Sequence, residues 1–94
     1  MFYYVYLLQS DLDQGLYIGF TADLRRRLAE HQQGVSISTK SRRPWRLIYY
    51  EAYLQKLDAE GREKFLKSGA GRTLLKKQLR NHFELFPLKP RDLT

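Results

Sequence analysis

The chain has 94 residues, of which 43% are hydrophobic and 14% aromatic, enough apolar side chains for one small domain with a single core. It contains no cysteine and no apolar run near the roughly 20 residues of a membrane span, which excludes disulfide bonds, thiolate metal sites and membrane helices and leads us to expect a cytoplasmic protein without a signal peptide. The formal net charge of +7 indicates a polyanionic partner, most often a nucleic acid, although a basic surface that only keeps a protein in solution has the same composition.

The first part of the chain predicts a β-hairpin. Residues 2–9 (FYYVYLLQ) are rich in aromatic and β-branched side chains, which favour a strand. Residues 10–15 have the composition of a turn and lead into a second strand over residues 16–20. Gly19 lies where this strand has to bend into the next element. Because glycine adopts backbone angles that are closed to other residues, we expect Gly19 to permit that turn.

A helix is expected over residues 22–33. Thr21 is a suitable N-cap for this helix, and Gly34 is a suitable stop at its C-terminal end. Leu24 and Leu28 are four residues apart, so they share one face of the helix. We therefore expect both leucines to face the core.

The second half of the chain is predicted to hold one more strand and two more helices. In chain order we expect an exposed basic loop over residues 35–44, a strand over 45–53, a helix from residue 57 or 58 to 67, a break over 68–71 and a helix over 72–83. In the strand, Arg46, Ile48 and Tyr50 are expected to share one face. The sequence therefore predicts an α/β (α+β) fold in which helices cover a small sheet, with one domain over residues 1–85 and an irregular tail over 86–94.

Few side chains of this sequence suit catalysis. His31 and His82 lack zinc-ligand spacing, and no glycine-rich phosphate loop follows a strand. What remains is tyrosines on the predicted strands, Arg27 at the edge of the buried stripe of its helix, and Glu63 in an otherwise basic helix. In phosphodiester cleavage a carboxylate can hold a divalent ion, an arginine can offset charge on the phosphorane, and a tyrosine can take or relay a proton. Each residue also has a structural explanation, such as an ion pair between Glu63 and Lys67.

The order of motifs along the chain resembles the GIY-YIG nuclease superfamily. Its two defining tripeptides are present as Tyr4-Val5-Tyr6 and Tyr17-Ile18-Gly19, joined by a short turn. The motifs that follow are LRRRLAEH (24–31), HQQG (31–34), RRPW (42–45), LIYYE (47–51) and REKFLKSG (62–69). The likeness runs from residue 2 to about residue 80 and is greatest for the small stand-alone bacterial group, which is related to the catalytic module of the excision-repair incision subunit.

This resemblance implies a fold and a set of site residues. The fold would be a three-stranded antiparallel sheet flanked by helices, with the site on one face. Tyr6 and Tyr17 would be the two active-site tyrosines, and Arg27 would be the catalytic arginine. Glu63 would be the single carboxylate that binds one divalent ion, Mg²⁺ or Mn²⁺. The reaction implied is hydrolysis of a DNA phosphodiester bond, with RNA not excluded.

The general base is not fixed by the resemblance. Phe20 stands where the excision-repair module has a lysine near the nucleophile. The base is therefore open between Tyr6, His31, which the resemblance places near the site, and a residue of the basic loop such as Lys40.

Two functions remain open from the sequence alone. One is a metal-dependent endonuclease that acts on branched, nicked or single-stranded DNA in repair or recombination, as a monomer or weak homodimer. The other is a nucleic-acid-binding module of the same fold with little or no catalysis. The presence of both Arg27 and Glu63 favours the endonuclease, because a pure binding module has no need for a carboxylate amid basic residues. Candidates for phosphate contacts, which position a backbone without reading sequence, are Arg25, Arg26, Lys40, Arg42, Arg43, Lys67, Arg72 and Lys76.

Overall fold

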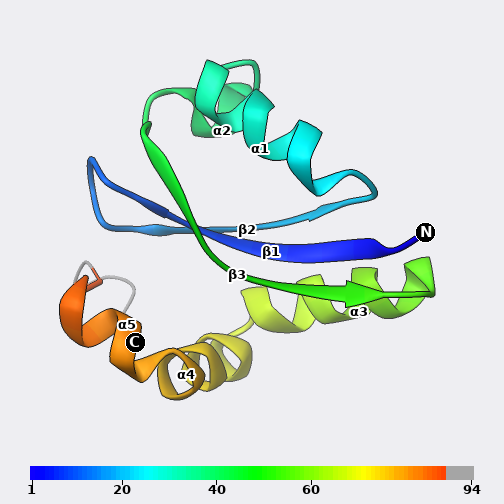
Figure 1. Ribbon diagram of the computed structural model, residues 1–94. Coiled ribbons are helices and arrows are strands. Elements are labelled where there is room, and N and C mark those ends of the chain that lie inside the picture. Colours follow the sequence, from blue (N-terminus) through cyan, green and yellow to red (C-terminus); the bar gives the residue numbers. More distant parts are fainter. Residues whose placement is uncertain (89–94) are drawn as a thin grey trace.

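In the computed structural model, which describes residues 1–88, three strands form one antiparallel sheet in the order β2-β1-β3 (Figure 1). The central strand is β1 (Tyr3–Ser10), which forms a hairpin with β2 (Leu16–Thr21) and pairs on its other edge with β3 (Trp45–Tyr53). The predicted three-stranded antiparallel sheet flanked by helices is therefore confirmed.

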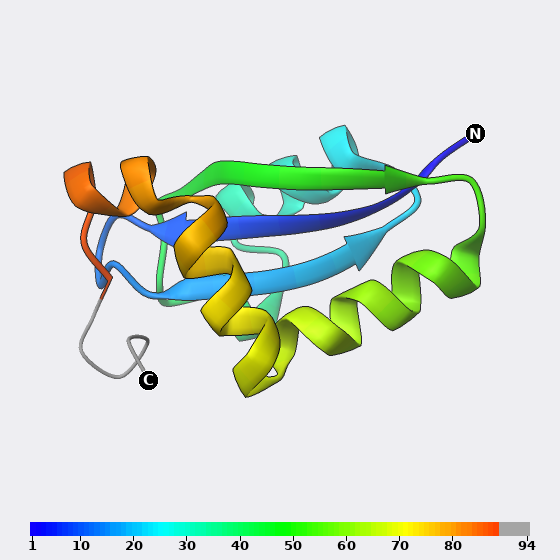
Figure 2. The same cartoon turned by 90° about the horizontal axis from the view of Figure 1, so that it is seen from below.

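Helices cover both faces of the sheet (Figures 1 and 2). On one face lie α1 (Leu24–Gln33) and the short α2 (Ile37–Lys40). On the other lie α3 (Lys56–Lys67), α4 (Gly69–Gln78) and α5 (Arg80–Leu85). Within residues 1–88, no helix has both the length and the apolar character needed to cross a bilayer.

Each face of the sheet has its own core, because successive residues of a strand point to opposite sides. Under α1 the buried residues are Tyr6, Leu8 and Trp45, and the predicted core residues Leu24 and Leu28 pack against them. The larger core, beneath α3 and α4, contains Val5, Leu7, Leu16, Ile18, Ala59, Leu66, Leu75 and Leu88. Leu88, in the expected tail, is buried in this core, and residues 89–94 of that tail lie outside the described residues.

The N-terminal end of α1 differs from the prediction. The cap is Asp23, whose carboxylate accepts a hydrogen bond from the backbone N–H of Arg26 at 3.2 Å. Thr21 ends β2, and its hydroxyl accepts from the N–H of Asp23 at 3.1 Å. The prediction of Thr21 as the cap was therefore wrong by two residues. At the other end Gly34 is the C-cap with φ of 79°, as expected for a left-handed stop.

Three further predictions about local structure were wrong in part. The loop expected over residues 35–44 contains α2, and the helix expected over 72–83 is divided at Leu79 into α4 and α5. The helix break expected over 68–71 is present after Lys67, where Ser68 separates α3 from α4, but residues 69–71 lie inside α4, which Ser68 caps by accepting from the N–H of Gly71 at 3.2 Å.

A β-bulge changes which residues of β3 share a face. The pairing of β1 with β3 shifts between Leu7 and Leu8, which leaves Ile48 as the extra residue of β3. Ile48 packs against the core beneath α3, whereas Tyr50 contacts the ring of Tyr4 on the opposite face. The predicted common face for Ile48 and Tyr50 was therefore wrong, because strict alternation holds only in a strand without a bulge.

Candidate active site

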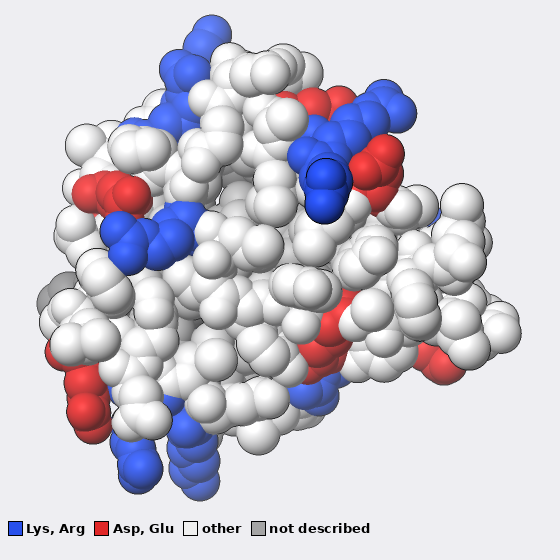
Figure 3. All heavy atoms as spheres, viewed as in Figure 1, with Lys and Arg blue, Asp and Glu red and all other residues white. Residues whose placement is uncertain are grey.

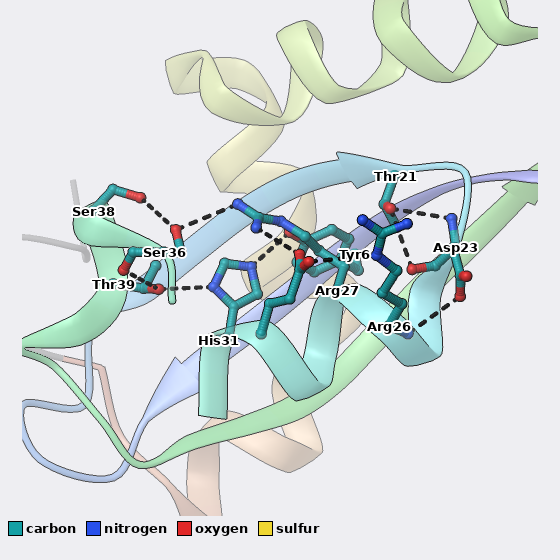
Figure 4. Close-up of polar contacts among 10 residues, drawn as sticks. Tyr6, Thr21, Asp23, Arg26, Arg27, His31, Ser36, Ser38 and Thr39 are labelled. Carbon is teal, nitrogen blue, oxygen red and sulfur yellow. Dashed lines mark hydrogen bonds and ion pairs between the residues drawn. The ribbon is translucent and has the colours of Figure 1, made fainter. Parts of the chain in front are cut away.

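Tyr6 lies at the centre of the candidate site. It occupies the middle of the central strand, where it pairs with Gly19 on β2 and with Tyr50 on β3. Its side chain is 1% exposed, and its hydroxyl lies 2.8 Å from Nε2 of His31 on α1 (Figure 4). The structure therefore brings together two predicted site residues that are 25 positions apart in the sequence.

Gly19 makes room for the ring of Tyr6. A Cβ atom at Gly19 would lie 2.3 Å from both Cζ and the hydroxyl oxygen of Tyr6. Gly19 is inside β2, which continues to Thr21, and the described glycine with a positive φ is Gly34. The predicted role of Gly19 in the turn was therefore wrong. The neighbouring strand, and not the local backbone, requires glycine at this position.

A chain of buried hydrogen bonds leads away from Tyr6. His31 is 0% exposed, and its Nδ1 lies 2.7 Å from Oγ1 of Thr39 on α2. In the tautomer with the proton on Nδ1, His31 donates to the Thr39 hydroxyl, which in turn donates to the carbonyl of Ser36 at 3.5 Å. Nε2 of His31 is then free to accept the hydroxyl hydrogen of Tyr6. Burial, together with the charge of Arg27, lowers the pKa of His31 and favours this neutral form.

Arg27 approaches Tyr6 from α1 (Figure 4). One of its terminal nitrogens donates to the carboxylate of Glu30 at 3.0 Å, and the other donates to Oγ of Ser36 at 3.3 Å. Burial lowers the pKa of Arg27, but the hydrogen bonds to Glu30 and Tyr6 outweigh it and raise that pKa. The guanidinium is therefore permanently charged and held in place beside the tyrosine hydroxyl.

Four other predicted site residues interact with Tyr6. Burial raises the pKa of Tyr6 to about 12, and the neighbouring Tyr17 and Glu63 act in the same direction, whereas Arg27 lowers it. The Tyr17 ring packs against His31 with 5.1 Å between centroids and against Tyr6 with 6.3 Å. Tyr17, Arg27, His31 and Glu63 therefore all lie within interaction range of Tyr6.

Glu63 is the one predicted site residue that comes from the opposite helical layer. It is half-buried on α3, where its carboxylate pairs with Nζ of Lys67 at 3.3 Å. Among the described residues no group of three or more His, Asp or Glu side chains gathers into a metal cage. A single carboxylate nevertheless fits Mg²⁺, which keeps several waters and takes its remaining ligands from substrate phosphates.

The eight basic residues predicted to contact phosphate are divided between the two helical layers. Arg25, Arg26, Lys40, Arg42 and Arg43 belong to the side of the molecule that carries α1 and α2, whereas Lys67, Arg72 and Lys76 belong to α3 and α4. Figure 3 shows Lys and Arg in separate groups around one face, with uncharged surface between them.

Arg42 and Arg43 bond to parts of the protein near α2. Nε of Arg42 bonds to the carboxylate of Asp13 at 2.7 Å. Nε of Arg43 donates to the carbonyl of Lys40 at 2.9 Å. Both side chains therefore hold the segment around α2 in place, which the sequence did not indicate.

Thr39, Ser36 and Glu30 are site residues that the sequence analysis did not find. All three act through hydrogen bonds to His31 or Arg27. Glu30 was open to detection, because it lies three residues after Arg27 on a helix. Ser36 and Thr39 carry no such signal, because a helix of four residues has no hydrophobic period.

The chain is similar in sequence to a family of known proteins. Residues 2–76 match the model of the GIY-YIG catalytic domain. A UPF0213 protein of Clostridium perfringens is 37% identical over 65 residues, which are 68% of this chain and 69% of the relative. A UPF0213 protein of Pediococcus acidilactici is 36% identical over 77 residues, 79% of this chain and 78% of the relative. The solution NMR structure of a UPF0213 protein from Bacillus halodurans is 27% identical, with a TM-score of 0.45 and coverage of 98% of this chain and 92% of that one.

The family model matches most of the chain. The matched segment of this chain includes both tripeptides, Arg27 and Glu63. These agreements show that the chain belongs to the GIY-YIG family of catalytic domains, a nuclease superfamily, and to the UPF0213 proteins within it.

Proposed function

We propose that the protein is a metal-dependent endonuclease that hydrolyses DNA phosphodiester bonds. The observation that carries this proposal is the contact of the Tyr6 hydroxyl with a buried, neutral His31 on one side and the Arg27 guanidinium on the other. Membership of a nuclease superfamily supports a nucleic-acid substrate. We further propose that the substrates are branched, nicked or single-stranded structures that arise in repair or recombination.

The proposed base is Tyr6 acting with His31. A pKa of about 12 makes free tyrosinate scarce near neutral pH. The Tyr6 oxygen can instead accept a proton from the attacking water while its own proton passes to Nε2 of His31, 2.8 Å away. Thr39 keeps the histidine in the tautomer that this transfer needs. Lys40 is a weaker candidate for the base, because its side chain is exposed on α2.

Arg27 and Glu63 have separate roles in this mechanism. Arg27 offsets the charge that builds on the phosphate oxygens, in a geometry that Glu30 and Ser36 fix before substrate binds. Glu63 would hold the divalent ion, Mg²⁺ or Mn²⁺, which supplies Lewis-acid activation of the phosphate when bound. The ring of Tyr17 packs against the rings of both His31 and Tyr6 and helps to hold them in place.

One observation favours the alternative, a binding module with little catalysis. Glu63 is paired with Lys67, so its carboxylate already has a cationic partner. This pair is weak, however, because Lys67 is 53% exposed and exposed ion pairs contribute little. A divalent ion can displace the lysine, and we therefore prefer the endonuclease.

The test is cleavage of supercoiled plasmid and of labelled branched and single-stranded oligonucleotides, with Mg²⁺, with Mn²⁺ and with a chelator. The site variants are Arg27→Ala and Glu63→Gln. Their matched controls are Arg80→Ala on α5 and Glu60→Gln, an exposed glutamate on the same helix as Glu63. Metal-dependent nicking that both site variants lose and both controls keep is the expected result.

Two results would contradict the endonuclease proposal. Salt-sensitive DNA binding without wild-type cleavage, unchanged in Glu63→Gln, would indicate the binding module instead. Cleavage that persists in both site variants would indicate a contaminating nuclease or a different site.

A further inference from the structure

Next to the candidate active site, three aromatic side chains form a partly exposed surface, which we call the aromatic platform (Phe2, Tyr4 and Tyr50). Phe2 is 46% exposed and Tyr50 is 52% exposed. The ring centroids of Phe2 and Tyr4 are 6.5 Å apart, and those of Tyr4 and Tyr50 are 6.0 Å apart in an edge-on arrangement. Exposed aromatic rings that touch one another are a surface on which a further planar group can stack.

The platform lies on the same face of the sheet as Tyr6. Tyr4 precedes Tyr6 by two residues on β1, and side chains two apart share a face. Tyr50 is the residue of β3 that pairs with Tyr6. Neighbouring strands are about 4.8 Å apart and two residues along a strand span about 7 Å, so the platform begins one strand away from the backbone of Tyr6, while the Tyr6 hydroxyl lies on the other side of β1, over Gly19.

A hollow of about 320 Å³ adjoins the platform. It is lined by Tyr4, Tyr50, Leu24 and Arg25 together with the loop residues Ala22 and Asp23. A second hollow, of about 260 Å³, contains the proposed catalytic Arg27 and shares Ala22 and Asp23 with the first. The two hollows therefore meet at the connection between β2 and α1, with the aromatic platform on one side and the catalytic arginine on the other.

The charges around the platform suit a phosphate. Arg25 is exposed and forms no ion pair with another described residue, whereas Arg26 and Arg27 both pair with Glu30. Asp23 is the acidic residue of the hollow, and its carboxylate is occupied as the cap of α1. An aromatic surface with an unpaired guanidinium at its edge matches a nucleotide, which combines a flat base with an anionic backbone.

We propose that the aromatic platform binds an unpaired nucleotide of the substrate, with its base stacked on Tyr50 and its phosphate on Arg25. This proposal deepens the proposed function and rests on it for the position of the cleaved bond next to the bound nucleotide. Bases inside a duplex are stacked on one another and cannot reach a protein ring, whereas unpaired bases can. The platform therefore selects single-stranded segments, flaps and gaps over continuous duplex.

The test measures binding in the presence of a chelator, so that it does not depend on cleavage. Fluorescence anisotropy would follow a labelled single-stranded oligothymidine, an abasic strand of the same length and a duplex. The variants are Tyr50→Ala, Tyr50→Trp, which keeps a stacking ring, and the control Leu57→Ala, which removes a side chain 80% exposed on α3.

We expect Tyr50→Ala to weaken binding of the oligothymidine at least about fivefold, the lower end of what one stacked base contributes. Tyr50→Trp should restore that binding, and Leu57→Ala should leave it unchanged. Binding of the abasic strand and of the duplex should be the same in wild type and Tyr50→Ala. An equal loss on the abasic strand, or unchanged oligothymidine binding in Tyr50→Ala, would overturn the proposal.

The two proposals fail in different ways. If plasmid nicking is absent from the wild type but oligothymidine binding depends on Tyr50, the endonuclease is wrong and the platform stands. If nicking is present and binding does not depend on Tyr50, the platform is wrong and the endonuclease stands.

Discussion

The two faces of the sheet carry similar polar residues. On one face these residues bond to one another, and on the other face they border a hollow that is open to solvent. On the α3 face, the Glu51 carboxylate accepts from the hydroxyls of Tyr49 and Tyr53 at 2.6 Å each and from Arg62 at 3.0 Å. That network is closed, because its donors all converge on one carboxylate. On the α1 face, Tyr6 and Arg27 also combine phenol and guanidinium, but Arg27 lines a hollow open to solvent. Tyrosine and arginine therefore stabilise one face and can serve chemistry on the other.

Removal of one hydroxyl from each face gives the strongest test of this contrast. We expect Tyr6→Phe to lower the plasmid nicking rate by about 100-fold or more, since a positioned acid or base contributes that much. Tyr49→Phe removes a hydroxyl from the closed network and should leave the nicking rate of the folded protein unchanged. Equal losses of rate in the two variants would show that the faces do not differ in this way.

The closed network should dominate stability. Glu51→Ala leaves the Arg62 guanidinium and two tyrosine hydroxyls without their shared acceptor. We expect this substitution to lower the free energy of unfolding by about 3 kcal/mol, measured by urea denaturation. The nicking rate per folded molecule should not change. A stable Glu51→Ala variant would show that the network contributes little to the fold.

Two glycine substitutions compare a crowded position with an open one. A Cβ atom at Gly19 meets the ring of Tyr6 at 2.3 Å, whereas a Cβ atom at Gly61 on α3 meets nothing within 4 Å. We expect Gly19→Ala to cost about 1–3 kcal/mol of unfolding free energy and to displace Tyr6. Gly61→Ala should instead stabilise α3 by up to about 1 kcal/mol. Thermal unfolding of both variants tests the sign of each effect.

Acidification should remove the stability contributed by His31 and the stability contributed by Glu51 at different pH values. Burial and Arg27 lower the pKa of His31 below its ordinary 6.5, so the unfolded chain takes up this proton first as the pH falls. The stability contributed by neutral His31 is therefore complete above pH 6.5 and is lost as the pH falls through the lowered pKa. Burial raises the pKa of Glu51, but Arg62 and the tyrosines outweigh it and hold that pKa below 4.5. The contribution of Glu51 is complete above pH 4.5 and is lost below it.

Urea denaturation at several pH values should therefore show two successive losses of stability. In His31→Asn the loss that begins near pH 6.5 should become smaller and keep only the share of His82, whose pKa is also lowered by burial and by Arg46, whereas the loss below pH 4.5 should remain. A His31→Asn variant that keeps the whole first loss would mean that His82 on α5, and not His31, is responsible.

The residues of the candidate site differ in how far the sequence predicted their position and contacts. Tyr6, Tyr17, Arg27 and Glu63 were predicted from the resemblance, and the electrostatic environment of Tyr6 includes the other three. The function of Gly19 was misjudged because the reason for glycine there is a side chain on the neighbouring strand, and strand pairing is not written in the local sequence.

The features that the sequence missed all depend on contacts between distant segments. Thr39 reaches His31 only because α2 folds back against α1, and four polar residues of helix leave no periodic signal. The bulge at Ile48 likewise depends on how β3 pairs with β1. Local patterns therefore predicted the elements and their order, while the polar contacts between elements needed the structure.

The position of Trp45 has a practical consequence for spectroscopy. It is the one tryptophan of the chain, it is 3% exposed, and its indole N–H donates to the carbonyl of Thr39 at 3.0 Å. Its ring also lies 6.1 Å from that of Tyr17. Selective excitation of this indole therefore gives a label-free emission signal from the wall of the candidate site. A red shift of that emission during a metal or oligonucleotide titration would report water entering beside α2, without any change to the protein.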